Sequence, residues 1–193
     1  MLLVVLALSG FLLRNALAAR PIPRAPGIIT PAEPSQTALA QPVRFSKDGF
    51  TISALAGFEF QARVILKADY NDFGARIAPV DLALGWGPMS DSSVLDALNV
   101  YQSDRFYFFE AKDQWPLPLE NVGYYSANMH VIPANPTVER GLRGLKSGNI
   151  VHLRGFLVHV DGPDGFTWTS SLTRTDAGNG ACELVWVESL EIR

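Results

Sequence analysis

The chain has 193 residues, of which 48% are hydrophobic and 18% charged, which is enough for one packed domain and too little for two. Its 16 basic and 19 acidic residues give a formal net charge of −3, and no basic cluster is present. Nucleic-acid binding is therefore not expected, because such proteins need a basic face to replace the counterions of phosphate. The single cysteine, Cys182, excludes an internal disulfide.

The first residues form an apolar run, 1–13, followed by Ala16-Leu17-Ala18. The small-x-small pattern predicts a signal peptide over residues 1–18, and the run is shorter than the roughly 20 residues that span a bilayer. No Lys or Arg precedes the run, so a truncated membrane anchor is the alternative. We expect an exported, periplasmic protein, either soluble or tethered, whose only membrane contact is through this segment. Removal of residues 1–18 takes away Arg14 and leaves 15 basic against 19 acidic residues, or −4.

Residues 19–42 contain six of the thirteen prolines, which predicts an extended linker, because proline fixes φ and removes backbone donors. The folded domain is expected over residues 43–193. Asp48-Gly49 between two apolar runs indicates a hairpin. The alternation of apolar residues over 58–68 predicts a long half-buried strand.

The middle of the domain combines glycine-interrupted and aromatic segments. Residues 79–91, PVDLALGWGPMSD, suggest a buried irregular segment, and Ser90 or Asp91 can cap a short helix that runs through Leu98. Residues 105–111, RFYFFEA, have the composition of a two-sided core strand. A stacking platform for bases is the weaker interpretation, since no basic cluster accompanies the aromatic residues.

The C-terminal half has the clearest local signals. Asn135-Pro136 predicts the start of a helix over residues 135–145. Residues 149–161 form a strand whose apolar phase changes at Gly155, which predicts a β-bulge there. Together with a last strand over 182–192, about seven strands and two short helices are indicated. The fold class is thus mainly β (α+β): a small antiparallel β-barrel, OB-like, with a two-sheet sandwich as the alternative.

The polar residues concentrate in residues 168–183, WTSSLTRTDAGNGACE. Cys182 could be a nucleophile with His130 as its base, although Glu183 beside the thiol would raise its pKa, and a lone Cys is often a buried small hydrophobe. His152 and His159 lack the local pairing of a zinc site, so no metal and no cofactor are expected. Arg174 and Asp176 could tie the glycine-rich loop.

Binding is a second role for this region, because a rigid charged loop at the mouth of a barrel is a common docking place for ligands. The candidates share polar or aromatic side chains on or near the loop and on the segments that precede it. They are Trp86, Asn128, His130, Trp168, Ser170, Arg174, Asp176 and Glu183.

Three segments, PVDLALGWGPMSD, SANMHVIPA and WTSSLTRTDAGNGACELVWV, resemble a family of uncharacterised bacterial proteins with an N-terminal membrane or signal segment. The resemblance implies a bacterial exported protein and brings no activity, substrate or cofactor. We therefore expect a non-enzymatic cell-envelope module that binds an envelope protein or a cell-wall component. The alternative is a thiol-dependent envelope enzyme, similar to hydrolases or transpeptidases, that uses Cys182 with His130.

Overall fold

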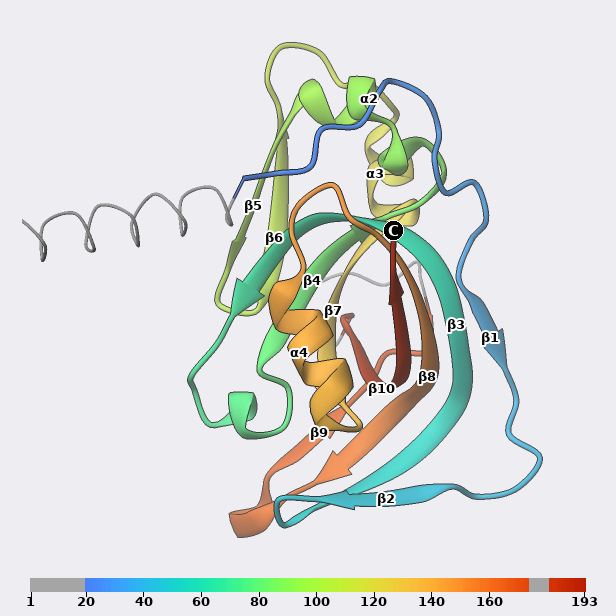
Figure 1. The fold of residues 1–193 in the computed structure, drawn as a ribbon, viewed down its shortest axis with the longest axis vertical. Helices are drawn as coiled ribbons and strands as arrows, with labels where there is room; N and C mark the ends of the chain where they lie inside the picture. Colours follow the sequence, from blue (N-terminus) through green and yellow to red (C-terminus); the bar gives the residue numbers. More distant parts are fainter. Residues whose placement is uncertain (1–19, 174–180) are drawn as a thin grey trace, which may run out of the picture.

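The computed structural model describes residues 20–173 and 181–193, and this part of the chain is mainly β (Figure 1). It contains ten strands and three short α-helices, where the sequence indicates about seven strands and two helices. The strands are β1 (Ser35–Thr37), β2 (Arg44–Lys47), β3 (Phe50–Asp69), β4 (Val80–Gly85), β5 (Leu98–Ser103), β6 (Phe106–Ala111), β7 (Ser126–Pro133), β8 (Ile150–Asp161), β9 (Thr167–Thr169) and β10 (Glu183–Ile192). The helices are α2 (Ser92–Asp96), α3 (Leu119–Tyr124) and α4 (Pro136–Gly144), with 3₁₀ turns η1 (Gly74–Arg76), η2 (Gly87–Ser90) and η3 (Pro163–Gly165).

Five strands pair in a closed ring, in the order β3-β4-β7-β10-β8 and back to β3. All pairs in the ring are antiparallel except β7 with β10, which is parallel. Helix α4 connects β7 to β8, which are the third and fourth of the five ring strands in chain order. This order and the single parallel pair are those of an OB-like barrel, so the predicted mainly β, OB-like fold is confirmed, and the ring favours a barrel over a sandwich.

Strand β3 closes the ring because it is long enough to pair on both sides. Its residues from Thr51 to Arg63 pair with β8, and those from Arg63 to Asp69 pair with β4. The strand curves strongly around the barrel (Figure 1). It begins at the predicted hairpin, where Asp48 and Gly49 both have positive φ, of 50° and 84°, as a tight two-residue turn requires.

The predicted bulge at Gly155 is wrong in position. The extra residues lie in the partner strands, between Ala54 and Ala56 of β3 and between Val187 and Ser189 of β10. Strand β8 keeps its alternation and buries both faces in different clusters. Leu153 and Leu157 pack inside the barrel, whereas Val158 and Val160 pack in a second cluster with Phe50, Ile52 and Trp186. Because β8 is buried on both faces, its apolar residues occur at odd and at even positions, which looks like a change of phase in the sequence.

The predicted irregular segment 79–91 is regular in its first half, where β4 is buried throughout. Asp91 caps α2 by accepting a hydrogen bond from the Ser93 amide, as expected, but the helix ends at Asp96 because Leu98 begins β5. Strand β6 is not a two-sided core strand, since it pairs only with β5 in a separate hairpin. One face of this hairpin is exposed, including the stacked rings of Tyr101 and Phe108.

Residues 20–42, most of the expected linker, lie along the surface of the domain and are bonded to it (Figure 1). Strand β1 pairs with β3, and the Ile22 amide donates to the carbonyl of Ser147. Thr30 is buried and its amide donates to Ser90 Oγ. Among residues 20–173 and 181–193, no helix is long and apolar enough to cross a membrane.

We predict that Gly155→Ala destabilises the fold by about 3 kcal/mol, because a Cβ at this position would overlap the carbonyl oxygen of Trp186 in the neighbouring strand. Chemical denaturation of the purified domain measures the change. Gly144→Ala at the end of α4 is the matched control, since a Cβ there meets no atom within 4 Å. A Gly155→Ala variant as stable as this control would contradict the prediction.

Candidate functional site

The hairpin of β5 and β6 turns at two non-glycine residues in the left-handed region of φ. Asp104 has φ of 50° and Arg105 has φ of 70°. Glycine or asparagine is favoured in such a turn, so an arginine there is conformationally costly. The contacts of the Arg105 side chain show what holds it in this conformation.

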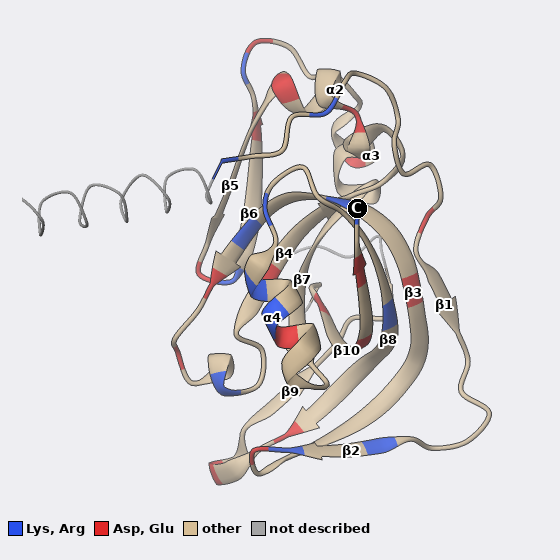
Figure 2. Ribbon diagram, viewed as in Figure 1, with Lys and Arg blue, Asp and Glu red and all other residues tan. Residues whose placement is uncertain are grey.

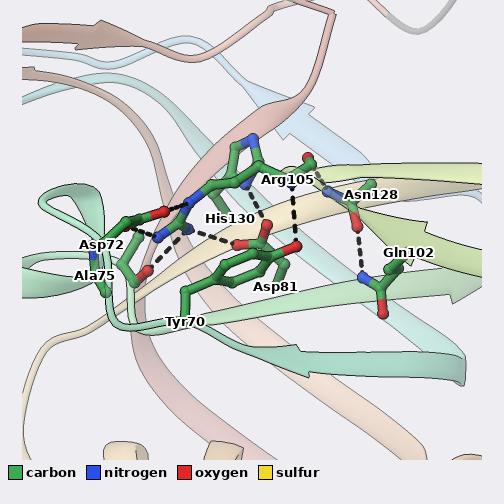
Figure 3. Close-up of polar contacts among 9 residues, drawn as sticks. Tyr70, Asp72, Ala75, Asp81, Gln102, Arg105, Asn128 and His130 are labelled. Carbon is green, nitrogen blue, oxygen red and sulfur yellow. Dashed lines mark hydrogen bonds and ion pairs between the residues drawn. The ribbon is translucent and has the colours of Figure 1, made fainter.

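Arg105 joins the hairpin to the loop between β3 and β4 and to β4 itself (Figure 3). Its Nε and Nη2 donate to the two carboxylate oxygens of Asp72, at 2.9 and 2.6 Å. Its Nη1 donates to Asp81 Oδ1 and to the carbonyl of Ala78, both at 3.0 Å. Burial opposes the charge of Arg105, but the bonds and charges of Asp72 and Asp81 outweigh it and raise the pKa of Arg105. The same bonds lower the pKa of Asp72.

Asp81 is the most buried charged residue of this cluster, with no exposed surface. It pairs across the strands with His130 of β7, and His130 Nδ1 lies 3.0 Å from Asp81 Oδ2. The two atoms are at ion-pair distance but out of line for a hydrogen bond. The His130 ring, 4% exposed, packs against Trp168 of β9 with ring centres 4.7 Å apart.

The backbone of the hairpin tip is also clamped to the barrel. The amide of Arg105 donates to the Tyr70 hydroxyl at 3.1 Å, and its carbonyl accepts from Asn128 Nδ2 at 2.9 Å. Asn128 is buried on β7 and accepts in turn from Gln102 Nε2 (Figure 3). Arg105 is thus fixed at its side chain, its amide and its carbonyl.

Aromatic rings line the surface beside this cluster. The Arg105 guanidinium lies over the rings of Tyr70 and Trp168, 4.2 and 5.3 Å from their centres. Trp168 contacts Phe166, and Phe166 contacts Phe73, which is 45% exposed. We call this set the aromatic–arginine strip; it consists of Tyr70, Phe73, Arg76, Arg105, Phe166 and Trp168.

The other predicted site residues lie apart from the strip or have structural contacts. Trp86 is in the barrel core and 1% exposed. Ser170 Oγ accepts from the Leu184 amide and donates to the Ser171 carbonyl, so it holds the start of β10. Glu183 is buried and Cys182 is half-buried beside it. Arg174 and Asp176 lie outside the described residues.

The predicted residues His130, Asn128 and Trp168 therefore come together, and the residues that organise them were missed. Asp81 is the one charged residue in an apolar sequence, PVDLALG, which forms the buried strand β4. A lone carboxylate in such a sequence could have indicated a buried charge that needs a partner. Asp72 and Arg105 have no local signal, because they meet only through the pairing of distant segments. No group of three or more His, Cys, Asp or Glu side chains suited to a metal ion occurs in the part of the chain that the structure describes.

Comparison with known proteins gave no match: no family model matches the chain, and neither a curated protein nor a solved structure matches it. The resemblance of the three segments to a family of exported bacterial proteins therefore stays a prediction.

We predict that Arg105→Met destabilises the domain by about 3 kcal/mol, because it leaves the buried Asp81 carboxylate without its cation. Denaturation curves measure the loss, and Arg154→Met, an exposed arginine on β8, is the control with less than about 0.5 kcal/mol of change. Adding Asp81→Asn to Arg105→Met should restore part of the stability, because the unpaired charge is gone. Equal losses in Arg105→Met and Arg154→Met would rule out this role of Arg105.

Tyr107 of β6 gives a pH-dependent prediction. Burial raises the pKa of its hydroxyl to about 12, and the nearby Glu183 and Cys182 add to the rise, although a hydrogen bond with Ser126 Oγ at 3.0 Å opposes it. Because the folded-state pKa lies above the unfolded value of about 10, the stabilising contribution is complete below pH 10 and is lost as the pH rises towards 12. Absorbance titration of tyrosinate should show a late phase near pH 12 that Tyr107→Phe removes. A titration curve left unchanged by Tyr107→Phe would contradict the assignment.

Proposed function

We propose that this protein is an exported, non-enzymatic binding module of the bacterial cell envelope, and that its aromatic–arginine strip holds a cell-wall glycan. The observation that carries the proposal is the row of contacting rings from Trp168 through Phe166 to Phe73, which Arg105 extends to Tyr70. The Arg105 guanidinium lies over the rings of Trp168 and Tyr70, and Arg76 lies over that of Phe73. Phe73 is exposed and the other three rings are half-buried, and aromatic faces at a protein surface are suited to stacking on the apolar faces of sugar rings.

The position of the strip supports a binding role. Tyr70, Phe73 and Arg76 belong to the loop between the first two strands of the ring, and Phe166 and Trp168 to the connection between β8 and β10. In OB-like barrels these two loops flank the face that binds oligonucleotides and oligosaccharides. The residues of the strip support a binding role independently of this likeness to other OB-like barrels.

Charge favours a glycan over a nucleic acid. Basic and acidic positions are interspersed along the ribbon, including on α4 (Figure 2). Arg105, the most central cation of the strip, already bonds the carboxylates of Asp72 and Asp81. These two negative charges oppose the binding of a phosphate at Arg105. A neutral sugar ring needs the aromatic faces and no counterion release. Arg76 lies 5.2 Å from the Phe73 ring centre and could contact an acidic group on the glycan.

A thiol-dependent envelope enzyme is the second candidate, and the buried Asp81–His130 pair is what favours it. A carboxylate at Nδ1 can orient an imidazole as a general base. However, the His130 ring is buried against Trp168, so little of it is accessible to a substrate. A buried acidic residue, Glu183, directly follows Cys182, and a negative charge beside a cysteine disfavours the thiolate that nucleophilic catalysis needs. We therefore prefer binding.

The test is co-sedimentation of the purified domain with isolated peptidoglycan sacculi. We expect Trp168→Ala to weaken binding by about tenfold, in line with the loss of one stacked ring. Trp115→Ala, which removes an exposed indole outside the strip, is the control and should leave binding unchanged.

Single-stranded DNA at low salt is the competing probe and should not bind. Absence of binding to sacculi, or equal binding by Trp168→Ala and Trp115→Ala, would refute the proposed glycan site.

A further inference from the structure

A pocket of about 420 Å³ lies at the other end of the β5–β6 hairpin from Arg105. The N-terminal segment, the middle of β3, α2 and β5 form its walls. Its lining residues are Pro21, Ile22, Pro23, Arg24, Arg63, Ile65, Ser92, Leu95, Asp96, Leu98, Val100 and Ser147. This volume is in the range of small-molecule sites. No residue of the aromatic–arginine strip contributes to it.

Arg63 of β3 is the unusual residue of this pocket. It is only 8% exposed, and its Nη1 donates to the Ser90 carbonyl at 3.0 Å and to Ser92 Oγ at 2.8 Å. Its Nε is fully buried and has no hydrogen-bond partner among the described residues. No carboxylate of residues 20–173 or 181–193 forms an ion pair with Arg63. Buried arginines are ordinarily paired, since an uncompensated charge away from water is costly.

The charges around Arg63 do not compensate it. Burial lowers the pKa of Arg63, and the positive charge of Arg24 lowers it further, against weaker opposing effects of Asp96 and Asp91. Arg24 also lines the pocket, where its guanidinium donates to the carbonyls of Gly148 and Arg193, both at 2.8 Å. The lining therefore has two cations and one carboxylate, the exposed Asp96. An anion bound in the pocket would balance this excess of positive charge.

Hydrogen bonds fix the walls of the pocket beside Arg63. Ser92 accepts from Arg63 and donates to the Arg24 carbonyl at 2.8 Å, so one hydroxyl links both arginine residues. The Ile22 amide donates to the Ser147 carbonyl, which fixes the N-terminal wall against the barrel. The remaining walls are apolar side chains, mainly Ile65, Leu95, Leu98 and Val100.

We propose that this pocket binds an amphiphilic anion, whose carboxylate or phosphate group pairs with Arg63 and whose short apolar body lies among Ile22, Ile65, Leu95 and Val100. Such a ligand supplies the charge partner that Arg63 lacks and covers the apolar walls at the same time. The site is independent of the glycan-binding strip.

Isothermal titration calorimetry of the purified protein with octanoate tests this assignment. Octanoate and octyl phosphate distinguish a carboxylate from a phosphate ligand, and octanol and acetate lack the charge and the apolar body, respectively. We expect one of the two amphiphilic anions to bind at one site per chain, at least about tenfold more tightly than octanol or acetate, as one charge-assisted pair predicts.

The variant Arg63→Met should weaken this binding by about tenfold or more, whereas Arg154→Met, which removes an exposed arginine outside the pocket, should not. Leu95→Trp is the second variant, because it fills the pocket and keeps Arg63; it decides the question where Arg63→Met does not fold. Equal binding of octanol, binding unaffected by Arg63→Met or Leu95→Trp, or no binding of either anion at millimolar concentration would overturn the proposal.

Discussion

The buried carboxylate of Asp81 is the constraint on which this site depends. It lies near the start of β4, a strand that is buried throughout, so its charge must be met from within the protein. Arg105 meets it from the hairpin, and His130 lies on its other side from β7. Because Arg105 must reach inward, the hairpin tip adopts positive φ at two residues and draws the Asp72 loop with it. One buried charge thus fixes the mutual position of three segments that are distant in sequence.

This arrangement explains where the rings of the aromatic–arginine strip lie. The β5–β6 hairpin contacts β7 through Asn128 and Ser126, so the chain itself covers part of the β4–β7 face. The surface left open is the edge where the Asp72 loop meets β9, and the rings of Phe73, Phe166 and Trp168 gather there. The cation between the rings is already bonded to carboxylates, which makes it a rigid part of the surface. A surface of fixed rings favours a ligand that stacks.

Elements that depend on neighbouring residues, such as helix caps and tight turns, were predicted correctly from the sequence. Asn135 caps α4 by accepting from the amides of Thr137 and Val138, and Asp48-Gly49 makes the β2–β3 turn. The errors have a common cause, which is pairing between distant segments. A strand at Leu98–Ser103 is recognisable only beside β6, and the phase of β8 is interpretable only when both buried faces are known. The meeting of Asp72, Asp81 and Arg105 likewise depends on tertiary structure, since no spacing in the sequence relates them.

The two arginines at opposite ends of the β5–β6 hairpin have opposite electrostatic situations. Arg105 bonds two carboxylates and a carbonyl of its own chain, so its charge is neutralised within the protein and stabilises the fold. Arg63 is also buried, but among the described residues it bonds only a serine hydroxyl and a carbonyl, and a second arginine, Arg24, lies nearby. Retaining a buried cation without a carboxylate costs stability that an apolar residue in the same strand would avoid. That cost is understandable where an external anion completes the pair, and a pocket with apolar walls adjoins Arg63 at this position.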